Sequence, residues 1–239
     1  MSTEGRTPGA PPGYVDAREW PGELVARVVT PAAPHRIHGY AVAADLARHE
    51  TVAAWLALAL TGELPASERR RPLEAALALA APVPIQRAAT HAARLAHVCG
   101  APSSSVLATA AVALAEAARV ELDEHAPWLD WLAGAEGPAP DVALAAEPGD
   151  AAAVDALLAA TAAPVRGLER GISQRAAVLA TLRACGLVER WQLETALVVA
   201  RLGVVVAEAV AVERGALGAH PMNLPRFEYV ESSPREPAE

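Results

Sequence analysis

Several arginines lie in the last third of the chain, and three of them are candidate site residues. They are Arg175, Arg201 and Arg226. A guanidinium presents a planar fork of N–H donors that matches the two oxygens of a carboxylate. Arg201 is the strongest candidate because it interrupts an apolar run, where an uncompensated buried charge is strongly destabilising. A partner for its guanidinium is therefore required.

The helical neighbours of Arg201 cannot supply that partner. The residues three and four positions away are all apolar, namely Leu197, Val198, Val204 and Val205. A carboxylate must come from another segment, a second subunit or a substrate. One structural alternative is an ion pair with Glu208 of a facing helix, including one across a two-fold dimer. Because structural ion pairs imitate ligand sites, the spacing leaves both interpretations open.

Two histidines have side chains that could exchange protons near neutral pH, His91 and His125. His125 directly follows Glu124, a carboxylate that could assist it. Each histidine also has a simpler interpretation as a buried, hydrogen-bonded residue. The spacing of His35, His38 and His49 would suit a metal, but no cysteine or paired carboxylate completes a four-ligand set. We therefore predict no metal site.

Composition limits the function further. The 239 residues carry a formal net charge of −8, and the pI near 5.4 argues against a nucleic-acid-binding surface. Hydrophobic residues make up 53% of the chain and charged residues 20%, which is typical of a globular protein. Cys99 and Cys185 form no CxxC pair, so a reduced, cytoplasmic protein is expected. A single long-range disulfide remains the alternative.

Export, membrane and nucleotide-binding signals are missing from the sequence. Residues 1–19 contain no apolar segment of the kind found in a secretion signal, and are predicted to be a disordered tail. The apolar run Ala196–Val212 is short for a bilayer span and contains Arg201 and Glu208, so a buried helix is predicted instead. The motifs of dinucleotide-binding, P-loop and serine-hydrolase proteins are also missing.

The elements that must position these side chains are helices separated by proline and glycine. Trp20–Thr30 and Arg36–Tyr40 are the only segments that favour strands. The three serines that begin at Ser103 are expected to cap the helix that follows them. Helical patterns cover the remaining segments, at 42–49, 51–61, 67–81, 87–98, 103–120, 151–160, 173–184 and 192–214. The predicted fold class is all-α.

A loop-rich stretch divides the helical pattern. Between Glu121 and Asp150 the chain collects prolines and glycines, which favour turns over continuous helix. We therefore predict a tail at 1–19, the first part of a large helical domain at 20–120, a reduced small lobe at 121–190, and the last helix and tail of the large domain at 191–239.

Several motifs, taken in order, resemble the citrate synthase family, and within it the short citryl-CoA lyases. They are Arg36-Ile37-His38-Gly39-Tyr40, Gly62-Glu63-Leu64-Pro65, Ala92-Ala93-Arg94-Leu95, Gly171-Ile172-Ser173-Gln174-Arg175-Ala176, and Ala200-Arg201-Leu202-Gly203. The resemblance covers most of the chain outside 122–170. It implies a citrate synthase-like multi-helical fold, a homodimer, and coenzyme A thioesters as ligands that are not permanently bound.

The resemblance fails at the catalytic positions of that family. Condensation or cleavage at an acyl-CoA carbon requires a carboxylate base, a histidine that holds the enolate oxygen, and a second histidine or arginine at the partner carbonyl. By alignment of the motifs, the base becomes Arg175 and the first histidine becomes Pro84. The family's Gly-His-Pro segment has no counterpart between Leu122 and Arg170.

Two arginines retain part of the family pattern. Arg201 matches an Ala-Arg-x-x-Gly stretch whose arginine binds a substrate carboxylate, although Gly203 comes one residue early. Arg226 matches the second arginine of an Arg-Pro-Arg-x-x-Tyr stretch from which an arginine can reach the neighbouring subunit's site. The resemblance therefore implies substrate-binding roles for both residues.

Three functions are compatible with these residues. The first is a family member without the standard acid–base set, which acts as a non-catalytic subunit that binds acyl-CoA, a carboxylate or a catalytic paralogue. The second is an active citryl-CoA lyase or condensing enzyme whose catalytic groups have moved to residues such as His91, His125 or Glu124, or are supplied by a catalytic paralogue in a mixed oligomer. The third is an unrelated helical interaction protein. Convergence of Arg175, Arg201 and a histidine on one cleft would favour the second.

Overall fold

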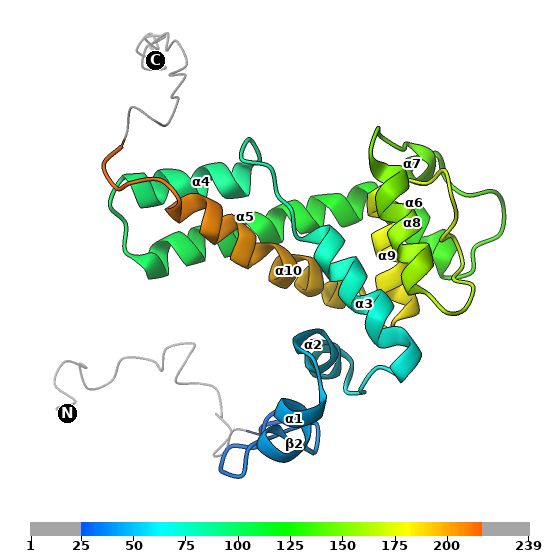
Figure 1. The fold of residues 1–239 in the computed structure, drawn as a ribbon, viewed down its shortest axis with the longest axis horizontal. Coiled ribbons are helices and arrows are strands. Elements are labelled where there is room, and N and C mark those ends of the chain that lie inside the picture. The colour runs from blue at the N-terminus through cyan, green and yellow to red at the C-terminus, as the bar shows by residue number, and fades with distance from the viewer. Residues whose placement is uncertain (1–24, 217–239) are drawn as a thin grey trace, which may run out of the picture. The chain divides into compact units, whose positions relative to one another are not determined.

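The computed structural model describes residues 25–216, which form two compact units divided between Thr51 and Val52. Within these residues the secondary structure is almost entirely helical, with one two-stranded sheet. Figure 1 shows the helices and their labels. The all-α prediction is therefore confirmed.

The first unit is built around a short hairpin. Strands β1 (Arg36–Ile37) and β2 (Tyr40–Ala41) pair antiparallel through a turn at His38 and Gly39. Both turn residues have positive φ, 45° and 89°, which suits a two-residue hairpin. A π-helical turn, η1 (Val42–Leu46), and the short α1 (Ala47–His49) follow. The expected strand at Arg36–Tyr40 is present as two short strands that the turn divides. Of the other expected strand, Trp20–Thr30, residues 20–24 lie outside the described residues, and the rest makes a single antiparallel bridge between Val29 and Ile37.

The second unit contains the remaining helices. They are α2 (Val52–Thr61), α3 (Ser67–Ala80), α4 (Ala88–Val98), α5 (Ser103–Glu124), α6 (Ala126–Leu132), α7 (Asp141–Leu144), α8 (Asp150–Ala160), α9 (Gln174–Ala184) and α10 (Arg190–Val210). Most of the predicted helices are present with ends shifted by a few residues. The differences are largest in the stretch predicted to be loop-rich, where α5 continues four residues beyond the predicted end at Val120 and α6 and α7 follow it. The last helix, α10, ends at Val210, four residues before its predicted end at Arg214.

Burial explains the extension of α5. Leu122 is fully buried, and the side chain of Glu121 is only 13% exposed, so packing holds the final turn in helical form. The expected caps at the start of α5 are wrong: Pro102 occupies the N-cap position without a side-chain hydrogen bond, and Ser103 already belongs to the helix. Ser173 does cap α9, since its Oγ accepts the Ala176 N–H at 3.2 Å.

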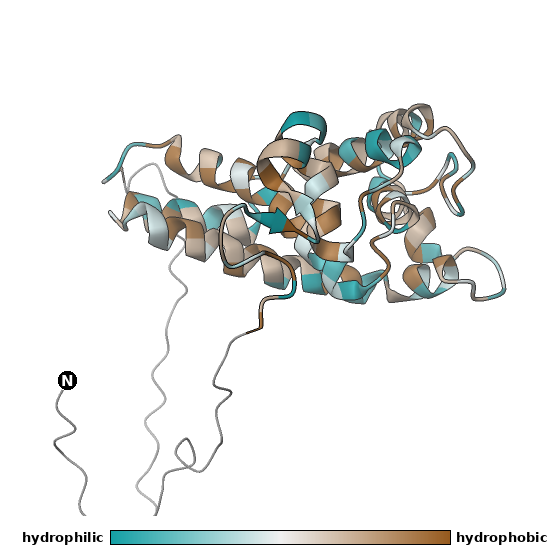
Figure 2. Cartoon of the chain, turned by 90° about the horizontal axis from the view of Figure 1, so that it is seen from below, coloured by the Kyte–Doolittle hydropathy of each residue, from teal (hydrophilic) through white to brown (hydrophobic). Residues whose placement is uncertain are grey.

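Two hydrophobic clusters hold the second unit together. The larger cluster packs α3, α6, α8 and α9 against the ends of α5 and α10, with Trp128 and several leucines at its centre. The smaller cluster joins α4, α5 and α10, and consists of Ala89, Ala93, Val106, Ala110, Leu114, Val205 and Ala209. Figure 1 shows α4, α5 and α10 extending side by side away from α6–α9. Figure 2 shows apolar residues recurring at successive turns of the helices.

Candidate functional site

Arg201 lies where α10 crosses the ends of α3 and α5. Its Nη1 is 2.8 Å from Glu121 Oε2, and its Nη2 donates to Glu121 Oε1 at 3.2 Å. Its Nε donates to the carbonyl oxygen of Ala80 at 3.1 Å. The side chains of Arg201 and Glu121 are only 12% and 13% exposed. The guanidinium is thus held on both sides by groups of this chain.

This arrangement identifies Glu121 as the carboxylate that pairs with Arg201. The carboxylate comes from another segment, as expected, but the specific expectation of Glu208 is wrong. Glu208 lies 3.9 Å from Arg94 instead, and is far more exposed than Glu121. Glu208 is only seven residues from Arg201 on the same helix, whereas α5 crosses the buried side of α10 and can present Glu121 there.

The contact with Ala80 also has a structural purpose. The last carbonyls of a helix have no partner within the helix, and a cation placed there interacts favourably with the helix dipole. Arg201 satisfies the carbonyl of Ala80, and Gln174 Nε2 donates to the neighbouring carbonyl of Leu79 at 2.8 Å. Side chains from α10 and α9 together complete the C-terminal end of α3.

His125 lies next to the same carboxylate residue. It is 4% exposed, at the junction of α5 and α6, and its Nδ1 is 2.8 Å from the carbonyl oxygen of Glu121. Two predicted site residues therefore contact Glu121, His125 at its backbone carbonyl oxygen and Arg201 at its carboxylate. Glu121 itself was not predicted. The available signal was its position on the buried face of the helix, three residues after Ala118 and seven after Leu114.

The other candidates lie elsewhere. Arg175 is the second residue of α9 and is exposed. Pro84 lies in the exposed linker between α3 and α4, and its carbonyl accepts the Arg87 N–H at 3.0 Å. His91 is exposed on α4. Arg226 lies outside the described residues.

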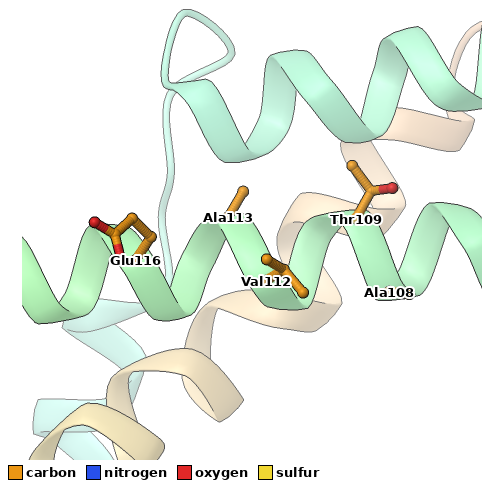
Figure 3. A pocket seen from close by; sticks show the side chains of 5 residues that line it. All are labelled: Ala108, Thr109, Val112, Ala113 and Glu116. Carbon is orange, nitrogen blue, oxygen red and sulfur yellow. The ribbon is translucent and has the colours of Figure 1, made fainter.

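Two hollows within residues 25–216 lie away from these side chains. One is lined by one face of α5 (Figure 3), and the other by the end of α8 with the loop after it. Neither includes Arg175, Arg201 or a histidine. The convergence that would favour relocated catalytic groups, an open cleft shared by these arginines and a histidine, is thus not seen in this part of the chain.

The two cysteines are free and differ in environment. Cys99 is exposed, whereas Cys185 is buried and its thiol donates to the carbonyl of Arg69 at 3.4 Å. Burial raises the pKa of Cys185 to about 11, and the nearby positive charge of Arg69 only partly offsets this. The thiol of Cys185 is therefore protonated at neutral pH and is a poor nucleophile.

Two further findings concern only the described residues. They contain no cluster of three or more histidine, cysteine or acidic side chains that could hold a metal ion. No helix among them has the length and apolar character needed to span a bilayer.

Comparison with known proteins supports the fold and nothing finer. By sequence, the chain matches no protein-family model and no curated protein. By structure, it is similar to citryl-CoA lyase from Hydrogenobacter thermophilus, with a TM-score of 0.60 and 18% sequence identity. The similarity covers 89% of this chain and 96% of the other. The chain therefore has a citrate synthase-like all-α fold.

Proposed function

We propose that this chain is a non-catalytic member of the citrate synthase and citryl-CoA lyase family, which acts as a binding or partner subunit. The proposal rests on the contacts that the side chain of Arg201 already makes within this chain. Its guanidinium already holds Glu121 with two contacts and the Ala80 carbonyl with a third. A substrate carboxylate would have to displace Glu121 and leave that carboxylate buried without a partner, which is unfavourable.

The residues at the remaining catalytic positions support the same proposal. Proton removal from an acyl-CoA carbon needs a base, and the guanidinium of the arginine at position 175 carries only hydrogen-bond donors and no acceptor. Stabilisation of the enolate oxygen needs a hydrogen-bond donor, and the proline at position 84 has none. By the motif alignment, both substitutions remove a function that the reaction requires. Acyl-CoA, a small carboxylate or a catalytic paralogue are the partners that this role implies.

The alternative is an active citryl-CoA lyase or condensing enzyme with relocated groups. One observation favours it: His125 and Arg201 contact the same residue, the histidine at the backbone carbonyl oxygen of Glu121 and the arginine at its carboxylate. In that case His125 would exchange the proton and Arg201 would hold the substrate. Both side chains are largely buried, and substrate access would require movement of α5 or α10.

Mass spectrometry of reaction products separates the two functions. The full-length protein is incubated with citryl-CoA, and separately with acetyl-CoA and oxaloacetate, beside an active citryl-CoA lyase as the positive control. We expect neither cleavage nor citrate formation. Native mass spectrometry of the same samples would report any bound thioester. Turnover by the wild-type protein that is lost in His125→Gln would contradict the proposal and establish the alternative.

Variants of Arg201 need a folding control. Arg201→Ala leaves Glu121 buried and unpaired, which costs about 3–5 kcal/mol of stability, so a loss of turnover in that variant would have two explanations. Arg201→Lys retains the positive charge and is the better variant. His125→Gln likewise retains a hydrogen-bonding group. Circular dichroism on each variant confirms that the helices are retained before activity is compared.

A further inference from the structure

The hydroxyl of Thr90, in the first turn of α4, is buried without a partner. The Thr90 side chain is completely buried, and its Oγ1 has no hydrogen-bond partner among the residues that the structure describes. Helical threonines commonly donate to the carbonyl four residues earlier. Four of them do so in this chain at 2.7 or 2.8 Å, namely Thr61, Thr161, Thr181 and Thr195. An unpaired buried hydroxyl is unfavourable, so that of Thr90 would gain from a partner that these residues do not supply.

Backbone donors of the same turn also lack partners within the helix. Arg87 is the N-cap residue of α4, and its side chain makes no capping hydrogen bond. The N–H groups of Ala88, Ala89 and Thr90 lie in the first turn, where no earlier carbonyl of the helix can accept from them. They point out of the N-terminus, which is the positive end of the helix dipole. Because helical side chains lean toward the N-terminus, the hydroxyl of Thr90 lies on the same side as these donors.

The charges along this part of the chain are positive. The stretch 75–115 contains no aspartate or glutamate, and its two arginines are Arg87 and Arg94. Arg94 lies 3.9 Å from Glu208. Arg87 is exposed and forms no ion pair with a carboxylate of the described residues. An unpaired guanidinium at the positive end of a helix favours the binding of an anion.

The chemistry of these groups selects the class of ligand. Backbone N–H groups, a guanidinium and a hydroxyl can all donate hydrogen bonds, and the guanidinium also carries a positive charge. A ligand group that accepts several hydrogen bonds and carries negative charge pairs with all of them, which describes a carboxylate or a phosphate. The guanidinium of Arg201 is not available to such a ligand, because Glu121 already occupies it.

We propose that the N-terminus of α4 binds one carboxylate or phosphate group through the N–H groups of Ala88 and Ala89, the guanidinium of Arg87 and the hydroxyl of Thr90. The hydroxyl is covered in this structure, so its contact with the anion requires a shift of the linker 82–86, most of which is exposed. This inference rests on the proposed function in one respect, since it names the class of ligand that a binding subunit holds. Turnover of citryl-CoA would overturn the proposed function alone, and a lack of anion binding would overturn this site alone.

The first test is an NMR titration of the full-length protein. Backbone amide shifts are followed while sodium phosphate, or in a second series sodium acetate, replaces sodium chloride at constant pH and ionic strength. The amide signals of Ala88, Ala89 and Thr90 are expected to shift saturably. Saturation by either anion supports the proposal, and the anion with the lower Kd identifies the ligand group as a phosphate or a carboxylate. No saturable shift of these three amides with either anion would overturn it.

Two variants test the side chains. Arg87→Gln removes the charge of an exposed residue and should raise the Kd at least about tenfold. Thr90→Val replaces the hydroxyl by a methyl group of similar size and should also raise the Kd. The stability of Thr90→Val against urea should be unchanged or higher, because the substitution removes an unpaired buried hydroxyl. A role of Thr90 in packing alone would leave the Kd unaltered.

Arg71→Gln is the matched control for the loss of charge. Arg71 is also exposed and forms no ion pair among the described residues, but it lies near the beginning of α3, at the opposite end of that helix from the linker to α4. This variant should bind the anion as the wild-type protein does. Circular dichroism confirms that the three variants retain their helices. An unchanged Kd in Arg87→Gln or Thr90→Val, or an equal loss of binding in Arg71→Gln, would overturn the proposal.

Discussion

The two hydrophobic clusters of the second unit both pack helices together, but their side chains differ in size. The larger cluster is built from big residues, with Trp128, Leu157, Ile172 and Leu179 almost completely buried. The smaller cluster between α4, α5 and α10 consists mainly of alanine and valine. Large side chains fill the space between several helices, whereas small ones only allow three helices to approach closely. The two regions therefore differ in how much apolar surface they remove from water.

Polar side chains add to the difference. Around the larger cluster, side chains from one helix reach the backbone of another: Trp128 Nε1 donates to the carbonyl of Ala176 at 3.0 Å, and Gln192 Nε2 to that of Leu60 at 2.9 Å. These bonds determine how the helices meet. In the three-helix region, large apolar residues remain on the outside, with Val112 the most exposed. Hydrogen bonds from side chain to backbone therefore link the helices of the larger cluster, whereas the three-helix region leaves Val112 on its surface.

The largest effect is expected in the larger cluster. Trp128→Ala should lower the free energy of unfolding by about 3–5 kcal/mol, because it leaves a cavity and removes the hydrogen bond to Ala176. Trp191→Ala is the matched control, since Trp191 is 53% exposed, and should change stability by less than about 1 kcal/mol. Urea unfolding followed by circular dichroism measures both. Equal losses in the two variants would contradict the assignment of Trp128 to the core.

A smaller effect is expected where the side chains are small. Ala110→Leu forces extra volume into the close contact between α5 and its neighbours, and should cost about 1–3 kcal/mol. Ala117→Leu adds the same group at an exposed position of the same helix and should be close to neutral. Thermal unfolding of the two variants gives the comparison. If Ala110→Leu were neutral, the three helices would be less tightly packed than the structure indicates.

The smallest effect concerns the cysteines. A thiol reagent at pH 8 should label Cys99 quickly and leave Cys185 unreacted until the protein unfolds, because the raised pKa keeps Cys185 protonated. Folding favours the protonated thiol, so this contribution to stability is present below the ordinary pKa of 9.0 and is lost as pH rises toward about 11. Peptide mass spectrometry identifies the labelled residue. Rapid labelling of Cys185 in the native protein would contradict its burial.

The glycine at position 167 illustrates why the larger cluster could not be predicted in detail. Gly167 has a φ of +77°, and a Cβ there would overlap the ring of Trp128. Sequence pattern indicates a glycine-containing loop at this point. It gives no sign that the loop must approach a tryptophan nearly forty residues earlier, because that contact depends on how α6 and α9 come together.

Helix positions were the most predictable feature of the chain. Proline and glycine limit where a helix can continue, and apolar spacing shows which side it buries; both act over only a few residues. The end of α2 before Gly62 and the capped start of α9 at Ser173 follow from such local rules. The end of α5 does not, because its last turn is held by the burial of Leu122 and the ion pair of Glu121.

The sequence by itself determined that the chain is helical, that Arg201 needs a carboxylate partner, and that a proline and an arginine stand at two positions where the resemblance places catalytic groups. These conclusions depend on residue type and on spacing along one helix. Only the tertiary structure decided that Glu121 supplies the carboxylate and that Arg201 also completes the end of α3. The contacting residues lie 80 and 121 positions apart from Arg201 in the chain, and the packing of α3, α5 and α10 brings them together.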